Sequence, residues 1–439
     1  MRKCEVARMK INKKLRSCLI TYAIVVIAFI VCELALNGTI DGFTIKRSLK
    51  NQLVPVCAYI VLAVSLNLTV GISGELSLGH AGFMSVGAFT GVVSASWLAN
   101  AFTMVNEAGK TVPVMSQTMM LILAMVIGGV FAGGAAVLVG IPALRLRGDY
   151  LAIVLLAFGE IIRNLLNCVY VAVEGAAIHM SLPLAGSSAP TFAKTATVVI
   201  DGAKGTKNSV MSVAFNNERF IVGFALVMVT LIVIFNLINS RSGRAIMAIR
   251  DNRIAAESTG LNVMKYKMMA FVTSAVLAGM AGALYGLNMR TVTAVDFDYN
   301  MSIEILLIVV LGGIGSIRGS VIAAVLLKLL PEQLRFLQDY RMLVYAIVLI
   351  AVMLATNSPI LKNLLAWLGS IKSLADIGKG VTNGVRNARN GVLYAEARML
   401  GGMAGSLKGM AGWFEKRQHA LEQKASGQTK NDGKAGDAQ

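Results

Sequence analysis

The chain has 439 residues, of which 56% are hydrophobic and only 15% are charged. The apolar residues come in blocks of about twenty, the length that a helix needs to cross roughly 30 Å of hydrocarbon, so a soluble globular protein is excluded and a polytopic membrane protein is predicted. The formal net charge of +18 is concentrated in a few segments, which is the pattern of membrane topology rather than of nucleic-acid binding.

Nine apolar blocks could cross a membrane as helices. They lie near 18–36, 53–72, 76–99, 118–143, 150–173, 220–239, 268–289, 303–330 and 342–357. The first follows a basic segment, as in a signal peptide, but it lacks a convincing small-residue cleavage site and further spans follow, so we interpret it as a retained anchor. The predicted fold is all-α, a polytopic transmembrane helical bundle of eight to ten membrane segments, with broken or re-entrant helices among them.

Basic residues gather near the N-terminus, in one internal loop and in the C-terminal tail. The first sixteen residues carry seven Lys or Arg against one acid, and the segment 240–267 carries six against two. Because positive residues mark the cytoplasmic side of membrane proteins, these segments are predicted to be cytoplasmic. We expect three regions: a basic cytoplasmic arm over 1–17, a transmembrane domain over 18–360, and a basic, partly disordered cytoplasmic tail over 361–439.

Nine simple crossings would place the two termini on opposite sides of the membrane, so one block crosses twice or not at all. The block 303–330 is the first suspect for a double pass, because "LGGIGSIRGS" (311–320) interrupts it with four glycines and Arg318. Irregular backbone at membrane depth is tolerated only where protein or a watery cavity surrounds it. The block 76–99, which begins in a stretch rich in Gly and Ser, is the second suspect.

Polar residues inside predicted spans are costly in lipid and usually face protein or water. Asn67, Glu160 and Glu304 are the notable ones, and Arg163 follows Glu160 at a spacing that allows an ion pair on one helix face. A structural hydrogen bond or ion pair is the simpler explanation, and a place in a gate or pathway is the alternative. The candidates for broken helices or a pathway are Asn67, Gly74, Ser77, Gly79, His80, Glu160, Glu304, Gly313, Gly315 and Gly319.

The sequence offers little support for enzymatic chemistry. His80, His179 and His419 lie far apart without metal-ligand spacing, and the chain has no G-x-x-x-x-G-K-[ST] phosphate-binding loop. The glycines at 306–319 fit a dinucleotide-binding turn only loosely, and their membrane context favours a helix break. We therefore predict no catalytic residue, metal site or cofactor in this chain.

The segment "RDNRIAAESTGLNVMKYK" (250–267) is charged and helix-competent, yet it lies between two apolar blocks. Asp251 or Asn252 can cap a helix N-terminus, and Gly260 can close that helix at the C′ position. A short, thin helix with one apolar side chain suits a groove of another protein, and a solvated loop is the alternative. The residues of this predicted docking segment are Arg250, Asp251, Asn252, Arg253, Ile254, Ala255, Ala256, Glu257 and Gly260.

Four longer stretches carry more specific patterns, in this order along the chain. They are "LNLTVGISGELSLGHAGFMSVGAFTG" (66–91), "LRLRGDYLAIVLLAFGEIIR" (144–163), "SGRAIMAIRDNRIAAESTGLNVMKYKMMAF" (242–271) and "SIEILLIVVLGGIGSIRGSVIAAVLL" (302–327). Together they resemble LivM-type permeases of branched-chain amino-acid ABC importers. In that family the third stretch resembles a variant of the EAA-type coupling helix, which docks into an ATPase subunit. The stretch 173–188 and the long tail after 370 depart from the family pattern.

The resemblance implies a permease that imports Leu, Ile and Val and is driven by separate subunits that hold ATP and Mg. It implies a second homologous permease subunit, two ABC ATPase subunits and an extracytoplasmic substrate-binding protein as partners, in the bilayer of a bacterial inner (plasma) membrane and without nucleic acid. A urea or short-chain amide importer of the same family is the alternative. A passive channel and an intramembrane enzyme are the other classes, and the docking segment argues against the first of them.

Overall fold

The structure is a computed structural model, and the residues it describes all belong to one compact unit within Met1–Val352. The described residues are 21–22, 25–30, 32–33, 47–105, 111–113, 115–146, 148–175, 177–182, 197–207, 217–333, 346–347 and 350. Ten residues of the predicted span near 18–36 are described, most of the span near 342–357 lies outside the described residues, and the predicted tail over 361–439 lies wholly outside them.

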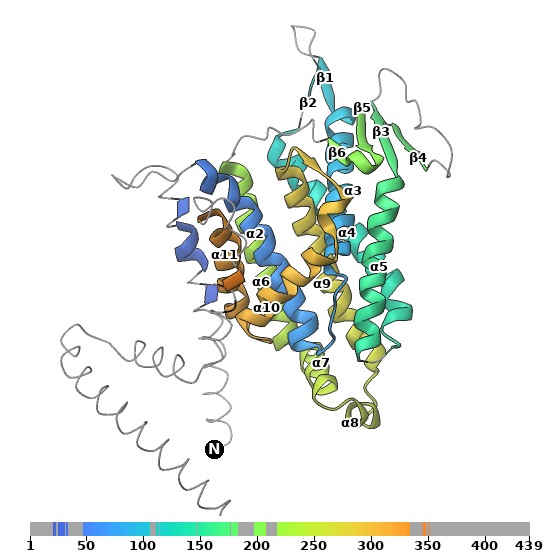
Figure 1. Ribbon diagram of the computed structural model, residues 1–439, viewed down its shortest axis with the longest axis vertical. Coiled ribbons are helices and arrows are strands. Elements are labelled where there is room, and N and C mark those ends of the chain that lie inside the picture. Colours follow the sequence, from blue (N-terminus) through green and yellow to red (C-terminus); the bar gives the residue numbers. More distant parts are fainter. Residues whose placement is uncertain are drawn as a thin grey trace, which may run out of the picture. The chain divides into compact units, whose positions relative to one another are not determined.

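Long helices dominate the part of the chain that the structure describes (Figure 1). They are α2 (Arg47–Asn67), α3 (His80–Ala101), α4 (Gln117–Ala143), α5 (Asp149–Cys168), α6 (Asn217–Asn239) and α9 (Val263–Asn288). Each of the six is long and apolar enough to cross a membrane, and α2 is prolonged by a short π-helix, Leu68–Ile72. The prediction of a polytopic helical membrane protein is confirmed.

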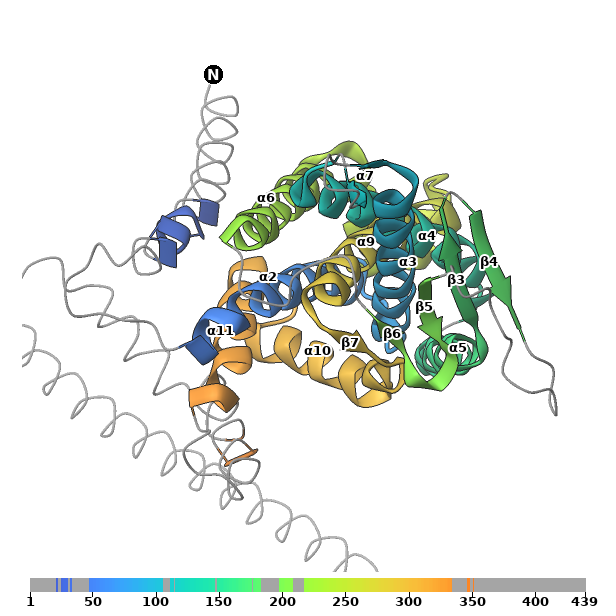
Figure 2. The ribbon, with the colours of Figure 1, turned by 90° about the horizontal axis from the view of Figure 1, so that it is seen from above.

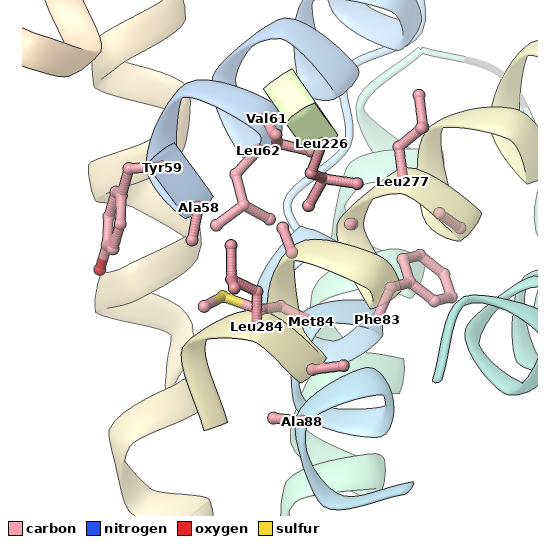
Figure 3. Close-up of a cluster of buried hydrophobic side chains, with 14 of the residues drawn as sticks. Ala58, Tyr59, Val61, Leu62, Phe83, Met84, Ala88, Leu226, Leu277 and Leu284 are labelled. Atoms are coloured by element: carbon pink, nitrogen blue, oxygen red, sulfur yellow. The ribbon is translucent and has the colours of Figure 1, made fainter. Parts of the chain in front are cut away.

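The core is built by close packing of α3 against α4 and α9, with α2 on the other side of α9 (Figures 2 and 3). Phe83 and Met84 of α3 are buried near Leu277 and Leu284 of α9. A Cβ added at Gly87 would overlap the backbone of α9 at Gly279. Small residues thus let the backbones of these helices come into contact. In lipid, van der Waals packing of this kind drives helix association in place of the hydrophobic effect.

One end of the molecule carries strands that the sequence analysis did not predict (Figure 1). A five-stranded antiparallel sheet has the order β4-β3-β5-β6-β7. Its strands are β3 (Tyr170–Glu174), β4 (Ala177–Ser181), β5 (Thr197–Asp201), β6 (Thr206–Lys207) and β7 (Thr291–Val292), and a separate hairpin pairs β1 (Thr103–Val105) with β2 (Thr111–Pro113). The single span predicted over 150–173 is wrong at its end, because the Val- and Tyr-rich residues after Cys168 favour a strand.

The opposite end carries two short helices, α7 (Arg241–Asp251) and α8 (Arg253–Ser258), between α6 and α9 (Figure 1). The sheet and the α7–α8 pair therefore lie at the two ends of the long helices. If the long helices cross the membrane, the sheet and the α7–α8 pair face opposite compartments.

The block 303–330 contains a reversal of the chain. It forms α10 (Tyr299–Gly312) and α11 (Ile317–Gln333), joined by residues 313–316, which we call the glycine turn. The two helices are antiparallel, because Gly312 contacts Gly319 beside the turn while Glu304 Oε1 lies 3.4 Å from Lys328 Nζ farther away. The block is therefore a helical hairpin, and its arms of 14 and 17 residues are shorter than the six long helices.

Candidate functional site

The predicted docking helix is present as α8, and its ends are made by the residues that the sequence indicated. Asn252 is the N-cap, and its Oδ1 accepts a hydrogen bond from the Ala255 backbone N–H at 3.1 Å. The chain leaves the helix through Gly260, whose φ of +81° is accessible to glycine at low cost. The cap is Asn252 and not Asp251, which is the last residue of α7.

The outward face of α8 is small, apolar at one point and charged around it. Ile254 is 80% exposed, and Ala255 beside it is exposed as well. Arg253 Nε donates to Glu257 Oε1 at 2.9 Å, one turn along the same face. The outward face of α8 therefore presents one apolar side chain beside an ion pair.

Ala256 does not belong to that outward face, contrary to the sequence prediction. Its side chain is buried against Ile249 of α7 and Val263 of α9, with Leu261 and Tyr266 around them. The six-residue helix buries one side and exposes the other, so adjacent alanines have opposite environments. Ala256 anchors α8 to the membrane domain and is unavailable to a partner.

Helix α7 was not predicted, and it changes the role of Arg250. The helix is capped by Ser240, whose Oγ accepts from the Gly243 N–H at 3.1 Å, and it buries Ile246 and Ile249. Arg250, its penultimate residue, points back towards the membrane domain and donates from Nη1 to the carbonyl oxygen of Gly71 at 2.8 Å. The prediction that Arg250 belongs to the outward docking residues is therefore corrected, because its side chain bonds to Gly71.

The glycine turn is held against the end of α2 by one buried amide. Asn67 Oδ1 accepts from the Gly315 N–H at 2.8 Å, and Asn67 Nδ2 donates to Ser320 Oγ at 2.7 Å. Gly313 and Gly315 have φ values of +91° and +83°, and a Cβ on Gly319 would overlap the carbonyl of Gly312. Asn67 therefore makes the interhelical hydrogen bonds expected of a polar group inside a membrane domain.

The chain between Ile72 and α3 is irregular and largely enclosed. Gly74 has a φ of +75°, and Gly79 is in backbone contact with Leu155 of α5. Glu75 pairs with Lys267 of α9 in a setting where both side chains are largely buried. The hydroxyl of Ser77 is buried without a hydrogen-bond partner and borders a small cavity. The cavity is lined by Thr69, Ser73, Glu75, Ser77, Leu144, Leu151, Leu155, Lys267 and Phe271.

Sequence comparison then places the chain among known proteins. The family described as "Branched-chain amino acid transport system / permease component" matches residues 48–353. The chain belongs to this family. It is 32% identical to the high-affinity branched-chain amino acid transport system permease protein LivM of Escherichia coli over 323 residues, covering 72% of this chain and 68% of that protein.

Two further relatives carry the same description. The LivM protein of Salmonella typhimurium is 32% identical over 317 residues, covering 71% of this chain and 69% of its own. A probable branched-chain amino acid transport permease protein LivM of Methanocaldococcus jannaschii is 23% identical over 308 residues, with 62% and 78% of the two chains covered. No solved structure matches the chain.

The remaining candidate residues of this permease are not brought together with the glycine turn. His80 is buried in the core, where its Nε2 lies 2.9 Å from Ser65 Oγ. Glu160 makes the predicted ion pair with Arg163, at 2.7 Å on the same helix. Glu304 is paired with Lys328, which also lies over the ring of Tyr59 at 3.5 Å from its centroid. Each of these polar groups has a structural partner.

Three tertiary contacts of the permease were not predicted from the sequence: the bond from Arg250 to Gly71, the pair of Lys267 with Glu75, and the bond from Asn67 to Ser320. Lys267 was counted only as a positive charge of the cytoplasmic loop, although it lies inside α9. Glu75 was the available indication, since an isolated acid between two apolar blocks requires a partner. Among the described ranges, no three His, Cys, Asp or Glu side chains cluster so that they could hold a metal ion.

Proposed function

We propose that this chain is the membrane permease subunit of an ATP-binding cassette importer that moves Leu, Ile and Val into the cell, with energy supplied by separate ATPase subunits. The observation that carries the proposal is the family match over residues 48–353, together with LivM relatives at 32% identity. ATP and Mg would bind to the partner subunits, so this chain would contribute mechanical coupling and no catalytic chemistry.

The proposed partners are two ABC ATPase subunits, a second homologous permease and an extracytoplasmic substrate-binding protein. Helix α8 supports the first, because Ile254 and Ala255 are presented to solvent on a helix that is fixed from behind by Ala256. The outer side of α5 exposes Tyr150, Ile153, Ile161 and Leu165. That face would meet lipid or another helical subunit.

We propose that the α7–α8 end and the N-terminus are cytoplasmic, in the inner (plasma) membrane of a bacterium. The support is electrostatic, since the segment 240–267 carries six Lys or Arg against two acids and the N-terminal sixteen residues carry seven against one. The five-stranded sheet would then face the outside, where the binding protein delivers substrate. An additional crossing by the hairpin of α10 and α11 would place both termini on one side.

A mechanism follows from the way α8 is attached. Closure of the ATPases on ATP would move α8, and the buried Ala256 contact would pass that movement to α7 and α9 as one body. The long helices would respond by opening the pathway alternately to the two sides of the membrane. The direction of transport, import, is inferred from the family. No residue spacing in the chain indicates it.

The urea or short-chain amide alternative predicts a different cargo for the same architecture. Reconstitution of the permease with its proposed partners in proteoliposomes distinguishes import of branched-chain amino acids from import of urea or short-chain amides. We expect leucine, isoleucine and valine to accumulate only when ATP is enclosed with the ATPases and the binding protein is present. Accumulation of urea or acetamide, with no uptake of leucine, would contradict the proposed substrate. Uptake that is independent of ATP would indicate a channel.

A further inference from the structure

We propose that Arg250 is a positioning residue that carries the movement of α7 and α8 to the glycine turn of the α10–α11 hairpin. The inference rests on the proposed function, because it assumes that ATPases move this end of the permease. It assigns to Arg250 a role inside the membrane domain and none in contact with the ATPase.

The first link joins α7 to the end of α2. The π-helix Leu68–Ile72 ends the α2 segment, and the last carbonyls of a helix lack partners within that helix. Arg250 Nη1 donates to one of them, the carbonyl of Gly71, at 2.8 Å. A charged donor makes this bond stronger than one between neutral groups. Helix α7 thus supplies the C-terminal cap of α2 from outside.

Two neighbours fix the direction of the Arg250 side chain. Asp251 Oδ1 accepts from Arg250 Nε at 3.2 Å and from Nη2 at 3.0 Å, which leaves Nη1 for Gly71. On the other side, Gly74 leaves room for the aliphatic part of the chain, since a Cβ there would lie 2.6 Å from Arg250 Cγ. The guanidinium therefore connects α7 with the turn after α2.

The second link joins Gly71 to the glycine turn. A Cβ on Gly71 would overlap both the amide of Asn67 and the backbone of Gly315, so these groups are in direct contact. The Gly315 N–H is bonded to Asn67, which also holds Ser320 at the start of α11. Because Gly71 is packed directly against Gly315, we expect a displacement of the Gly71 carbonyl to move the glycine turn.

A third contact limits how the movement can be dissipated. The chain beyond Gly74 is tied to α9 by the pair of Glu75 with Lys267, whose side chains are 17% and 10% exposed. The segment between Gly71 and Glu75 is therefore held at both ends. A movement of Arg250 would therefore displace the α10–α11 hairpin, because the segment 71–75 cannot rotate freely to absorb it.

The test compares Arg250→Gln with Arg241→Gln in the reconstituted complex. Both side chains are exposed and both substitutions remove one positive charge from α7, but of the two only Arg250 reaches the Gly71 carbonyl. For Arg250→Gln we expect normal co-purification of the ATPases and continued ATP hydrolysis. Leucine transported per ATP hydrolysed should fall about tenfold or more, as for loss of one charge-assisted hydrogen bond. Arg250→Lys keeps a charged donor but lacks the planar guanidinium with its several N–H groups. It should recover part of the leucine transported per ATP hydrolysed.

The outcomes separate this inference from the proposed function. If the parent complex transports no leucine, the proposed function fails before Arg250 is tested. If the parent transports leucine and Arg250→Gln keeps the parent ratio of transport to hydrolysis, the inference is overturned. It is equally overturned if Arg250→Gln loses the ATPases or the folded permease, because Arg250 would then serve docking or stability alone. A matching loss in Arg241→Gln would show a general charge effect and would also overturn it.

Discussion

Gly319→Ala is expected to reduce leucine uptake to less than about a tenth of the parent value, although it adds a single methyl group. The Cβ would overlap the carbonyl of Gly312 in the facing helix, where no flexible side chain can move aside. Overpacking of this kind costs about 1–3 kcal/mol or more, and the hairpin must open to relieve it. Uptake in proteoliposomes, normalised to the amount of inserted permease, measures the effect.

Gly134→Ala is the matched control, because a Cβ at Gly134 in α4 would meet no atom within 4 Å. It should transport as the parent does. Gly315→Leu should give an intermediate loss, since its φ of +83° strains any side chain even though the position is exposed. Parent-like uptake by Gly319→Ala would show that α10 and α11 are not packed as a closed hairpin during transport.

Ala255→Trp is expected to reduce co-purification of the ATPases about tenfold or more while leaving the permease folded. Ala255 is exposed beside Ile254, so a large ring would be added to the outward face of α8 and nowhere else. Central interface positions commonly contribute about 2 kcal/mol or more to binding, and a groove that fits alanine cannot admit tryptophan. The measurement is the ATPase-to-permease ratio after affinity purification.

Ala177→Trp is the control for added exposed surface, because Ala177 lies in β4 at the opposite end of the molecule (Figure 1). It should leave the ratio unchanged. Glu257→Lys should act in the same direction as Ala255→Trp with a smaller effect, since it replaces an exposed ion pair with Arg253 by a like-charge contact. ATPase binding by Ala255→Trp at the parent level would remove α8 from the interface.

Local features could be predicted from the sequence because they depend on neighbouring residues. Asn252 and Gly260 mark the two ends of α8, and capping rules identify them without tertiary information. The ion pair of Glu160 with Arg163 follows from helical spacing. The glycines after α10 predicted a reversal for the same reason. The structure has the ends of α8 and the break between α10 and α11 close to these residues.

Features that depend on distant segments could not be predicted. The five-stranded sheet joins strands from 170–174, 177–181, 197–207 and 291–292, so its strand order depends on segments far apart in the chain. The orientation of Arg250 depends on the Gly71 carbonyl, 179 positions earlier in the chain. The burial of Ala256 likewise depends on contacts with α7 and α9. The sequence alone therefore does not distinguish Ala256 from Ala255.

The most direct measurement of whether this permease is driven through α8 is photo-crosslinking from Ser258, an exposed residue at the end of that helix. In a background without the five native cysteines, Ser258→Cys would be labelled with a benzophenone maleimide and irradiated in the assembled complex. We predict a crosslinked product containing the permease and one ATPase subunit, absent when Ala177→Cys carries the label. If labelled Ser258→Cys gives no crosslinked product with an ATPase subunit in a complex that retains its ATPases, α8 does not contact the ATPases and the proposed coupling through α8 is contradicted.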